Sequence, residues 1–150
     1  MLPKPAIQIR LQLLFALICA GLIGCADANQ DPSSSLEPDN RWLVLNYWAE
    51  WCKPCLEEIP ELNAFAAANN HRVRVVLVNF DGVSGDALTQ QITELGIKTD
   101  YLVADPAATL GIERPQALPS TFIFNPDRQL MHTLLGPQTV ASLSAATDGQ

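Results

Sequence analysis

Residues 48 to 55 read Trp48-Ala49-Glu50-Trp51-Cys52-Lys53-Pro54-Cys55, and they join two segments of different hydrophobic periodicity. The preceding segment, 42–48, is apolar almost without alternation, which is typical of a strand covered on both faces of a parallel or mixed sheet. The following segment, 53–69, places apolar residues at three- and four-residue steps and predicts an amphipathic helix. We therefore expect the two cysteines where a buried strand gives way to the start of a helix.

The rest of the chain alternates strands with helices. Its hydrophobic patterns predict strands at 72–80, 101–103, 121–124 and 130–135, and helices at 84–95, 106–112 and 139–146. Asn125-Pro126-Asp127-Arg128 separates the last two strands and is a hairpin signal. This order of elements predicts an α/β protein built as a three-layer α/β/α sandwich.

The spacing of Cys52 and Cys55 fits reversible disulfide chemistry. Residues three apart at the start of a helix lie on one face, so a disulfide can close with little backbone movement. Cys52 would meet unpaired helix N–H groups, and this positive end, together with Lys53, lowers a thiol pKa below its ordinary value of about 8.5. Pro54 suits the first helical turn because it lacks an N–H. Cys52 is the predicted nucleophile and Cys55 the resolving thiol.

Other roles for the two cysteines stay open. Structural zinc is disfavoured, because the two histidines, His71 and His132, do not follow a Cys/His finger spacing. A purely structural disulfide is disfavoured, since closing so short a loop constrains the unfolded chain little. Delivery of Cu(I) is a further alternative, but it has no obvious third ligand. A binding module without turnover is the last one, and we expect no metal or cofactor.

The first 24 residues predict an export signal. Lys4 and Arg10 precede an apolar run, 11–23, which as a helix would cover about 20 Å at ~1.5 Å per residue. A bilayer core is roughly 30 Å thick, so a cleaved signal is favoured over a spanning helix. The run closes with Leu22-Ile23-Gly24-Cys25, which resembles the bacterial lipobox and implies a lipid anchor on Cys25. A free Cys25 is the alternative.

The residues after Cys25 bear on location and on domain boundaries. Ala26, with Asp27 one place later, departs from the inner-membrane retention signal of such lipoproteins, which slightly favours the outer membrane over the inner one. Residues 25–40 are rich in Asp, Asn, Pro and Ser and predict a flexible tether. The folded domain is then expected at 41–150.

Composition limits the compartment and the partners. At 150 residues and 48% hydrophobic, the chain is long and apolar enough for one folded domain. Its formal charge of −7 repels nucleic-acid phosphates and anionic lipid head groups, so neither is an expected partner. With Cys19 removed and Cys25 lipidated, Cys52 and Cys55 would be the free thiols of an exported protein in an oxidising compartment.

Two motifs carry a resemblance to a known family. The run from Trp48 to Cys55 after an apolar strand resembles the active-site segment of thioredoxins, and Leu118-Pro119-Ser120-Thr121-Phe122 resembles their cis-proline loop. Within that superfamily the chain is most similar to the TlpA/ResA branch of membrane-tethered periplasmic oxidoreductases. The matching features are Asn46 in place of a buried Asp, Glu58-Ile59-Pro60, Asp105-Pro106, Gly111-Ile112 and a central helix–strand insertion at about 84–103.

The resemblance implies roles for individual residues. Pro119 would be cis and would hold a partner chain beside Cys52. Glu58 is the candidate for managing the proton of the resolving thiol. Asn46 would be a buried hydrogen-bonded group that raises the pKa of Cys55 less than an Asp would.

The side chains around the motif are expected to have supporting places. Glu57 and Glu61 are assigned to the exposed face of the helix. Trp48 and Trp51 are expected to pack around the site.

The chain also departs from the family pattern. The likeness covers about 41–147, and the tether leaves little room for the N-terminal hairpin that members usually have, so one edge of the sheet is expected to be less protected. The hairpin 125–129 lacks the usual glycine of its D-x-x-G, so its turn is expected to differ.

The function implied by the resemblance is that of a periplasmic, membrane-tethered thiol–disulfide oxidoreductase. It would reduce disulfides in exported proteins, with the haem-ligating cysteines of apocytochrome c as the best-known substrates of the family, and would take electrons from an upstream membrane thiol–disulfide donor. A disulfide oxidase of the same fold is the close alternative, because Lys53-Pro54 does not fix the redox poise.

Overall fold

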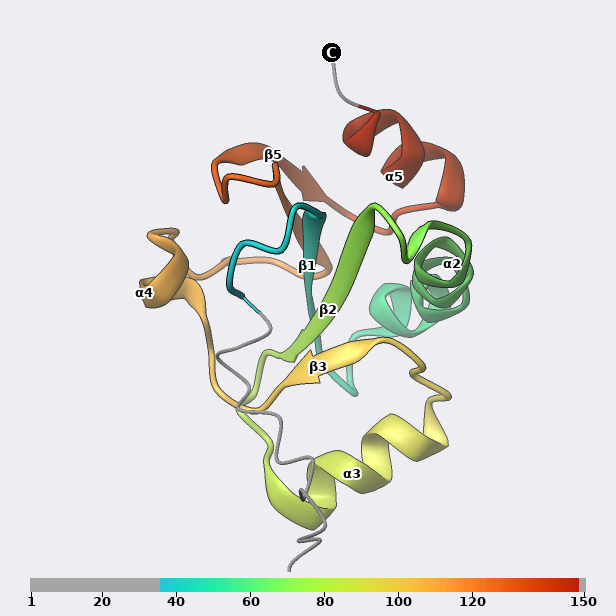
Figure 1. Ribbon diagram of the computed structural model, residues 1–150. Coiled ribbons are helices and arrows are strands. Elements are labelled where there is room, and N and C mark those ends of the chain that lie inside the picture. Colours follow the sequence, from blue (N-terminus) through green and yellow to red (C-terminus); the bar gives the residue numbers. More distant parts are fainter. Residues whose placement is uncertain (1–35, 149–150) are drawn as a thin grey trace, which may run out of the picture. The chain divides into compact units, whose positions relative to one another are not determined.

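The computed structural model describes residues 36–148, and its elements follow the predicted order (Figure 1). The expected signal peptide at 1–24, the expected lipidation site Cys25 and the expected tether up to residue 35 lie outside the described residues. The predicted ends of the elements differ from the observed ones by at most two residues. The elements are β1 (Trp42–Trp48), α2 (Lys53–Asn69), β2 (Val73–Asn79), α3 (Gly85–Glu94), β3 (Asp100–Leu102), α4 (Ala107–Leu110), β4 (Ser120–Phe124), β5 (Leu130–Leu135) and α5 (Val140–Thr147).

The strands form one mixed five-stranded sheet in the order β3-β2-β1-β4-β5. β2 is parallel to β1 and β3, whereas β4 is antiparallel to β1 and β5. The central strand β1 is buried from Leu43 to Trp48, which accounts for its continuous apolar pattern. Because β1 and β2 are parallel, they stop at the same end of the sheet. We call this the cysteine end, since Cys52 follows β1 there.

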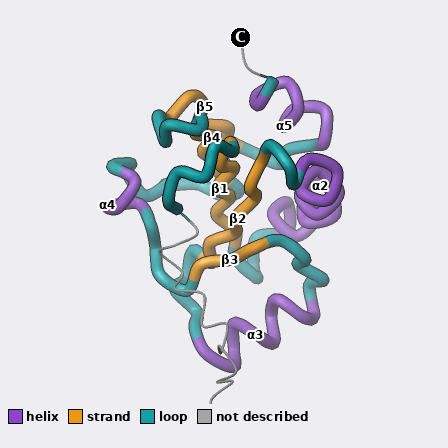
Figure 2. The backbone as a smooth tube through the Cα atoms, viewed as in Figure 1, coloured by secondary structure: helices purple, strands orange, loops and turns teal. Residues whose placement is uncertain are grey.

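Helices cover both faces of the sheet (Figures 1 and 2). On one face, Val44 and Trp48 belong to a core cluster with apolar residues of α2, α3 and α5. On the other face, Leu45 and Tyr47 belong to a second cluster, against which Leu110 of α4 packs. The predicted three-layer sandwich, with the helix–strand insertion formed by α3 and β3, is confirmed.

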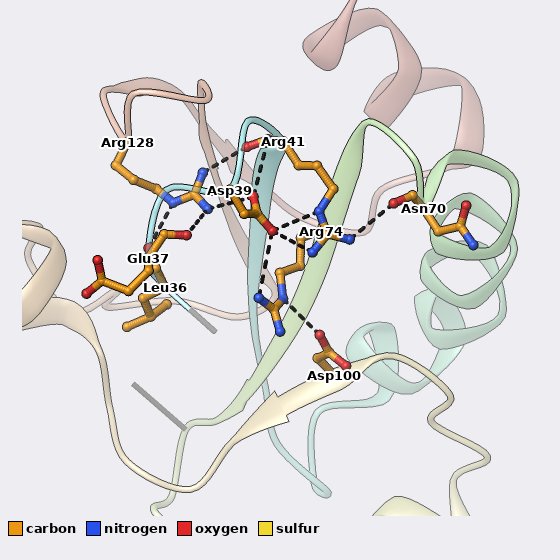
Figure 3. Close-up of polar contacts among 8 residues, drawn as sticks. All are labelled: Leu36, Glu37, Asp39, Arg41, Asn70, Arg74, Asp100 and Arg128. Atoms are coloured by element: carbon orange, nitrogen blue, oxygen red, sulfur yellow. Dashed lines mark hydrogen bonds and ion pairs between the residues drawn. The ribbon is translucent and has the colours of Figure 1, made fainter. Parts of the chain in front are cut away.

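Residues 36–40 pack against the domain, although we expected them to be the end of a flexible tether. Leu36, the large apolar residue of this stretch, is buried. Arg128, from the β4–β5 turn, donates hydrogen bonds to the carbonyl oxygens of Leu36 (2.9 Å), Glu37 (2.7 Å) and Arg41 (2.8 Å) (Figure 3). The prediction is corrected here: these five residues belong to the packed domain, because one apolar side chain and one distant arginine hold them.

Arg128 lies in the hairpin turn 125–129, which lacks the glycine of the family pattern. Its φ of 62° is left-handed, a conformation that costs a non-glycine residue roughly 1–2 kcal/mol. The turn still closes, because Asn125 and Gln129 are joined through a backbone hydrogen bond of 3.0 Å. The hydrogen bonds of the guanidinium to residues 36–41 offset the backbone cost.

Five charged residues meet at the end of the sheet where β1 and β2 begin (Figure 3). Asp39 accepts hydrogen bonds from Arg41 Nε (2.8 Å) and Arg128 Nη2 (3.2 Å), and Arg74 pairs with Asp100 (2.9 Å) and Asp39 (3.9 Å). Partial burial raises the pKa of Asp39, but the hydrogen bonds from the arginines outweigh it and hold this pKa below its ordinary value. We call these five residues the arginine cluster; it lies opposite the cysteine end.

Candidate active site

Cys52 and Cys55 are joined by a disulfide at the start of α2, with their Cα atoms 5.2 Å apart. Cys52 is the residue that precedes the helix, and its carbonyl oxygen accepts the backbone N–H groups of Cys55 (2.9 Å) and Leu56 (3.1 Å). Cys52 is 4% exposed and Cys55 is fully buried. Cys52 thus keeps a small contact with solvent and Cys55 none, an order that suits a nucleophile followed by a resolving thiol.

Lys53 and Pro54 occupy the first turn of α2. Pro54 lies in the first turn, where a backbone N–H would have no partner within the helix, so its lack of an N–H costs no hydrogen bond. The Lys53 side chain is 86% exposed, and its Nζ lies 3.7 Å from the Glu57 carboxylate. This ion pair offsets part of the positive charge, and solvent screens the rest. The helix terminus therefore remains the main source of positive potential at Cys52.

Glu58 is buried, one turn after Cys55, and links three elements of the fold. Its carboxylate accepts hydrogen bonds from Asn46 Nδ2 of β1 (2.7 Å) and from the backbone N–H of Gln138 before α5 (2.8 Å). Asn46 Nδ2 also donates to Thr121 Oγ1 of β4 (3.0 Å). Burial raises the pKa of Glu58 above its ordinary value, against the opposing effect of these hydrogen bonds. A carboxyl with a raised pKa can exchange a proton closer to neutral pH.

Pro119 lies at the cysteine end, directly before β4. The peptide bond between Leu118 and Pro119 is cis, as the resemblance implied. Antiparallel pairing sets Ser120 of β4 opposite Tyr47 of β1, and the Pro119 carbonyl oxygen accepts the Gly136 N–H after β5 (2.9 Å). Sequence positions more than sixty residues apart are thus brought to one end of the sheet.

The two tryptophans differ in a way that the sequence did not predict. Trp48 is buried and packs as expected, whereas Trp51 is 66% exposed. Its indole Nε1 donates a hydrogen bond to Asp81 Oδ2 (2.8 Å). The packing prediction is therefore wrong for Trp51, because the residue lies in the short loop before α2 and turns toward solvent.

Several neighbours of the site were missed or misplaced by the sequence reasoning. Glu50, next to Trp51, accepts a hydrogen bond from Gln91 of α3 (2.8 Å), which ties the inserted helix to the cysteine loop. Glu61, expected on the exposed face, instead accepts the backbone N–H of Val140 (2.8 Å) and so caps α5. Only Glu57 keeps the exposed place expected for it. These contacts join distant segments, and no local pattern signals them.

Two classes of feature are not found among residues 36–148. No group of three or more His, Cys, Asp or Glu side chains in this part of the chain could hold a metal ion. No helix of the same residues has the length and apolar character needed to cross a bilayer.

Comparisons with known proteins agree with this geometry. A model of the AhpC/TSA family matches residues 23–133. The thiol-disulfide oxidoreductase ResA of Bacillus subtilis is 25% identical over 159 residues, covering 91% of this chain and 88% of that protein. A thiol:disulfide interchange protein DsbE homologue of Paracoccus denitrificans is 34% identical over 95 residues, which is 63% of this chain but only half of that protein.

A solved structure shares the fold. The DsbF homologue of Corynebacterium diphtheriae superposes with a TM-score of 0.63 at 23% identity, over 74% of this chain and 73% of that one. The mixed sheet and its covering helices are therefore a thioredoxin-like fold.

Proposed function

The chain belongs to the AhpC/TSA family and is a thiol–disulfide oxidoreductase, and from this premise we propose that it works as a disulfide reductase on exported proteins. The observation that carries the proposal is the Cys52–Cys55 pair at the start of α2. This pair can pass between dithiol and disulfide, and as a dithiol it can give two electrons to a partner disulfide.

The reaction proceeds by two exchanges of sulfur bonds. The Cys52 thiolate attacks one sulfur of the partner disulfide, so that a mixed disulfide forms and the second partner sulfur leaves as a thiolate. Cys55 then loses its proton and attacks Cys52 Sγ, which releases the first partner sulfur. The partner gains two electrons and ends as a dithiol. The Cys52–Cys55 disulfide is then reduced again by a membrane thiol–disulfide donor.

The neighbouring residues support these steps. Glu58, buried one turn from Cys55, takes the proton that Cys55 loses, and Asn46 holds the Glu58 carboxylate in place. Pro119 offers its backbone to an extended partner chain during the mixed disulfide. The positive end of α2 stabilises the Cys52 thiolate. Lys53 adds a positive charge that solvent screens, and Pro54 fixes the backbone of the first helical turn.

The proposed location is the periplasmic side of the cell envelope. The apolar run 11–23 and the lipobox-like Leu22-Ile23-Gly24-Cys25 support export and a lipid anchor on Cys25, with the outer membrane slightly favoured. Exported disulfide proteins, among them apocytochrome c, are the substrates that the resemblance supports.

A trapping experiment tests the mechanism. In Cys55→Ser the second exchange cannot occur, so a mixed disulfide between Cys52 and the partner should accumulate and be visible on non-reducing gels. Cys52→Ser is the matched control, and it should abolish exchange and trap nothing. Equal activity of both variants and the wild type would contradict the mechanism.

The direction of electron flow needs its own measurement. A reductase requires a low reduction potential for the Cys52–Cys55 pair, so that the partner is the better electron acceptor. A potential of about −120 mV, the range of strong oxidants, would overturn the reductase assignment and favour an oxidase of the same fold.

A further inference from the structure

The segment between β3 and β4 carries the chain across one face of the sheet and ends at Pro119. Most residues from 103 to 118 are exposed, and the four-residue helix α4 is the secondary structure within it. A segment with few buried contacts needs specific anchors to keep one conformation. Two charged side chains, Asp105 and Arg114, supply such anchors.

Asp105 fastens the beginning of the segment to the core. Its Oδ1 accepts the phenol O–H of buried Tyr47 (2.7 Å) and the backbone N–H of Ala107 (2.9 Å). Partial burial raises the pKa of Asp105, but the hydrogen bonds from Tyr47, Ala107 and Arg114 outweigh it and hold this pKa below its ordinary value. Asp105 is therefore ionised at neutral pH, and its carboxylate is held in place to pair with the Arg114 guanidinium.

Arg114 fastens the later half of the segment. Its Nε donates to Asp105 Oδ2 (2.9 Å), and its Nη2 donates to the carbonyl oxygen of Phe80. The guanidinium carbon also lies 3.9 Å from the centre of the Phe80 ring, a cation–π contact. Phe80 follows β2 at the cysteine end, where its N–H donates to the Trp48 carbonyl oxygen (2.7 Å). One side chain thus joins the segment to the ends of β1 and β2.

Little else fixes the approach to Pro119. Between residues 106 and 116 of the described structure, the hydrogen bond from Arg114 to the Phe80 carbonyl oxygen is the one that reaches outside the segment, while Leu110 and Ile112 make apolar contacts with the core. After it, Ser120 Oγ donates to the Ala117 carbonyl oxygen (2.8 Å), and Leu118 packs on the core. Without Arg114, the chain leading to Pro119 would rest on apolar contacts that do not fix its direction.

We propose that Arg114 is a positioning residue, which holds the approach to Pro119 in the conformation that a partner chain needs in order to bind. The inference rests on the proposed function, in which the partner lies along the Pro119 backbone. The hydrogen bonds and the ring contact of Arg114 involve Asp105 and Phe80 and not the sulfurs, so its effect is on binding of a chain and not on exchange itself.

Kinetics with two disulfides of different size test the proposal. Insulin offers a polypeptide chain around its disulfides, whereas Ellman's reagent offers only a small aromatic disulfide. Arg114→Gln should raise KM for insulin roughly three- to tenfold, the scale of losing one ordinary hydrogen bond, with kcat unchanged. The rate with Ellman's reagent should stay at the wild-type value. Arg114→Lys, which can keep one of the two hydrogen bonds, should recover part of the loss.

Arg128→Gln is the matched control, because it also removes a guanidinium that braces one segment against another, but at the opposite end of the sheet. It should lower the melting temperature and leave KM for insulin unchanged. An unchanged KM in Arg114→Gln, an equal rise in Arg128→Gln, or a matching loss with Ellman's reagent would overturn the proposal. If the wild type itself exchanged with neither disulfide, the proposed function would fail instead.

Discussion

The two ends of the sheet use charge in different ways. The five side chains of the arginine cluster, three arginines and two aspartates, are paired with one another, and Arg128 also donates to three backbone carbonyls. At the cysteine end, Glu50 and Asp81 accept hydrogen bonds from neutral groups, so their negative charge is not compensated by these partners. The charged side chains of the arginine cluster are engaged in contacts that hold the fold together. At the cysteine end, the carboxylates of Glu50 and Asp81 and the exposed Trp51 ring are available to a partner.

This difference separates stability from activity. Residues of the arginine cluster should matter for unfolding and little for disulfide exchange. Residues at the cysteine end should matter for exchange, with effects on unfolding that follow their burial. Each substitution below either sharpens this division or breaks it.

The largest effect on stability is expected from Arg128→Gln. The substitution removes the donors to Leu36, Glu37 and Arg41 and keeps the left-handed backbone cost, so the free energy of unfolding should fall by roughly 2–4 kcal/mol. Denaturant unfolding of the oxidised protein measures it. Exchange with Ellman's reagent should be unchanged, and a loss of exchange in the folded variant would break the division between the two ends.

A smaller effect, dependent on pH, is expected from Glu58. Because its pKa is raised in the folded state, the native protein keeps this proton to higher pH than the unfolded chain does. Its contribution to stability is therefore greatest below the ordinary value of 4.5 and is lost as pH rises through the raised pKa. The free energy of unfolding, measured from pH 4.5 upward, should decline in the wild type, and the Glu58→Gln substitution should remove this decline.

Two comparisons make the assignment to Glu58 specific. Glu57→Gln, an exposed change on the same helix, should leave the decline in place. Asp39 and Asp105 act with the opposite sign, since their lowered pKa values give stability that is lost only as pH falls below the ordinary value of 3.8. A decline that persists in Glu58→Gln would show that another group carries it.

The smallest effect on stability is expected from Asp81→Asn. Its hydrogen bond to Trp51 is exposed to solvent, so the free energy of unfolding should change by less than about 0.5 kcal/mol. The fluorescence of Trp51 should nevertheless change, because the indole loses a charged neighbour. A large loss of stability would mean that the cysteine end also depends on its polar contacts for folding.

The sequence was sufficient for the order of elements but not for the contacts that join them. The unbroken apolar run of β1 and the three- and four-residue steps of α2 are local patterns, and both elements begin and end where predicted. Cys52, Cys55 and Pro119 were found from motifs, and the structure brings their segments to one end of the sheet. Such features are encoded within a few neighbouring residues.

The misses concern residues whose roles depend on distant partners. The sequence showed only that the turn 125–129 lacks a glycine, yet the Arg128 side chain in that turn holds residues 36–41, more than eighty positions away. Glu61 was predicted to be a solvated helix residue, yet its carboxylate caps α5. The role of Arg114 could not be predicted, because neither Asp105 nor Phe80 lies close enough in sequence to form a recognisable pattern with it.

The most direct test of the account is the pKa of the Cys52 thiol in the reduced protein. Alkylation of Cys52 by iodoacetamide, quantified by mass spectrometry across a range of pH, reports the fraction of thiolate. If the start of α2 stabilises the thiolate as proposed, the apparent pKa should lie clearly below the ordinary thiol value of about 8.5. A value at or above that figure would contradict the assignment of Cys52 as the attacking sulfur.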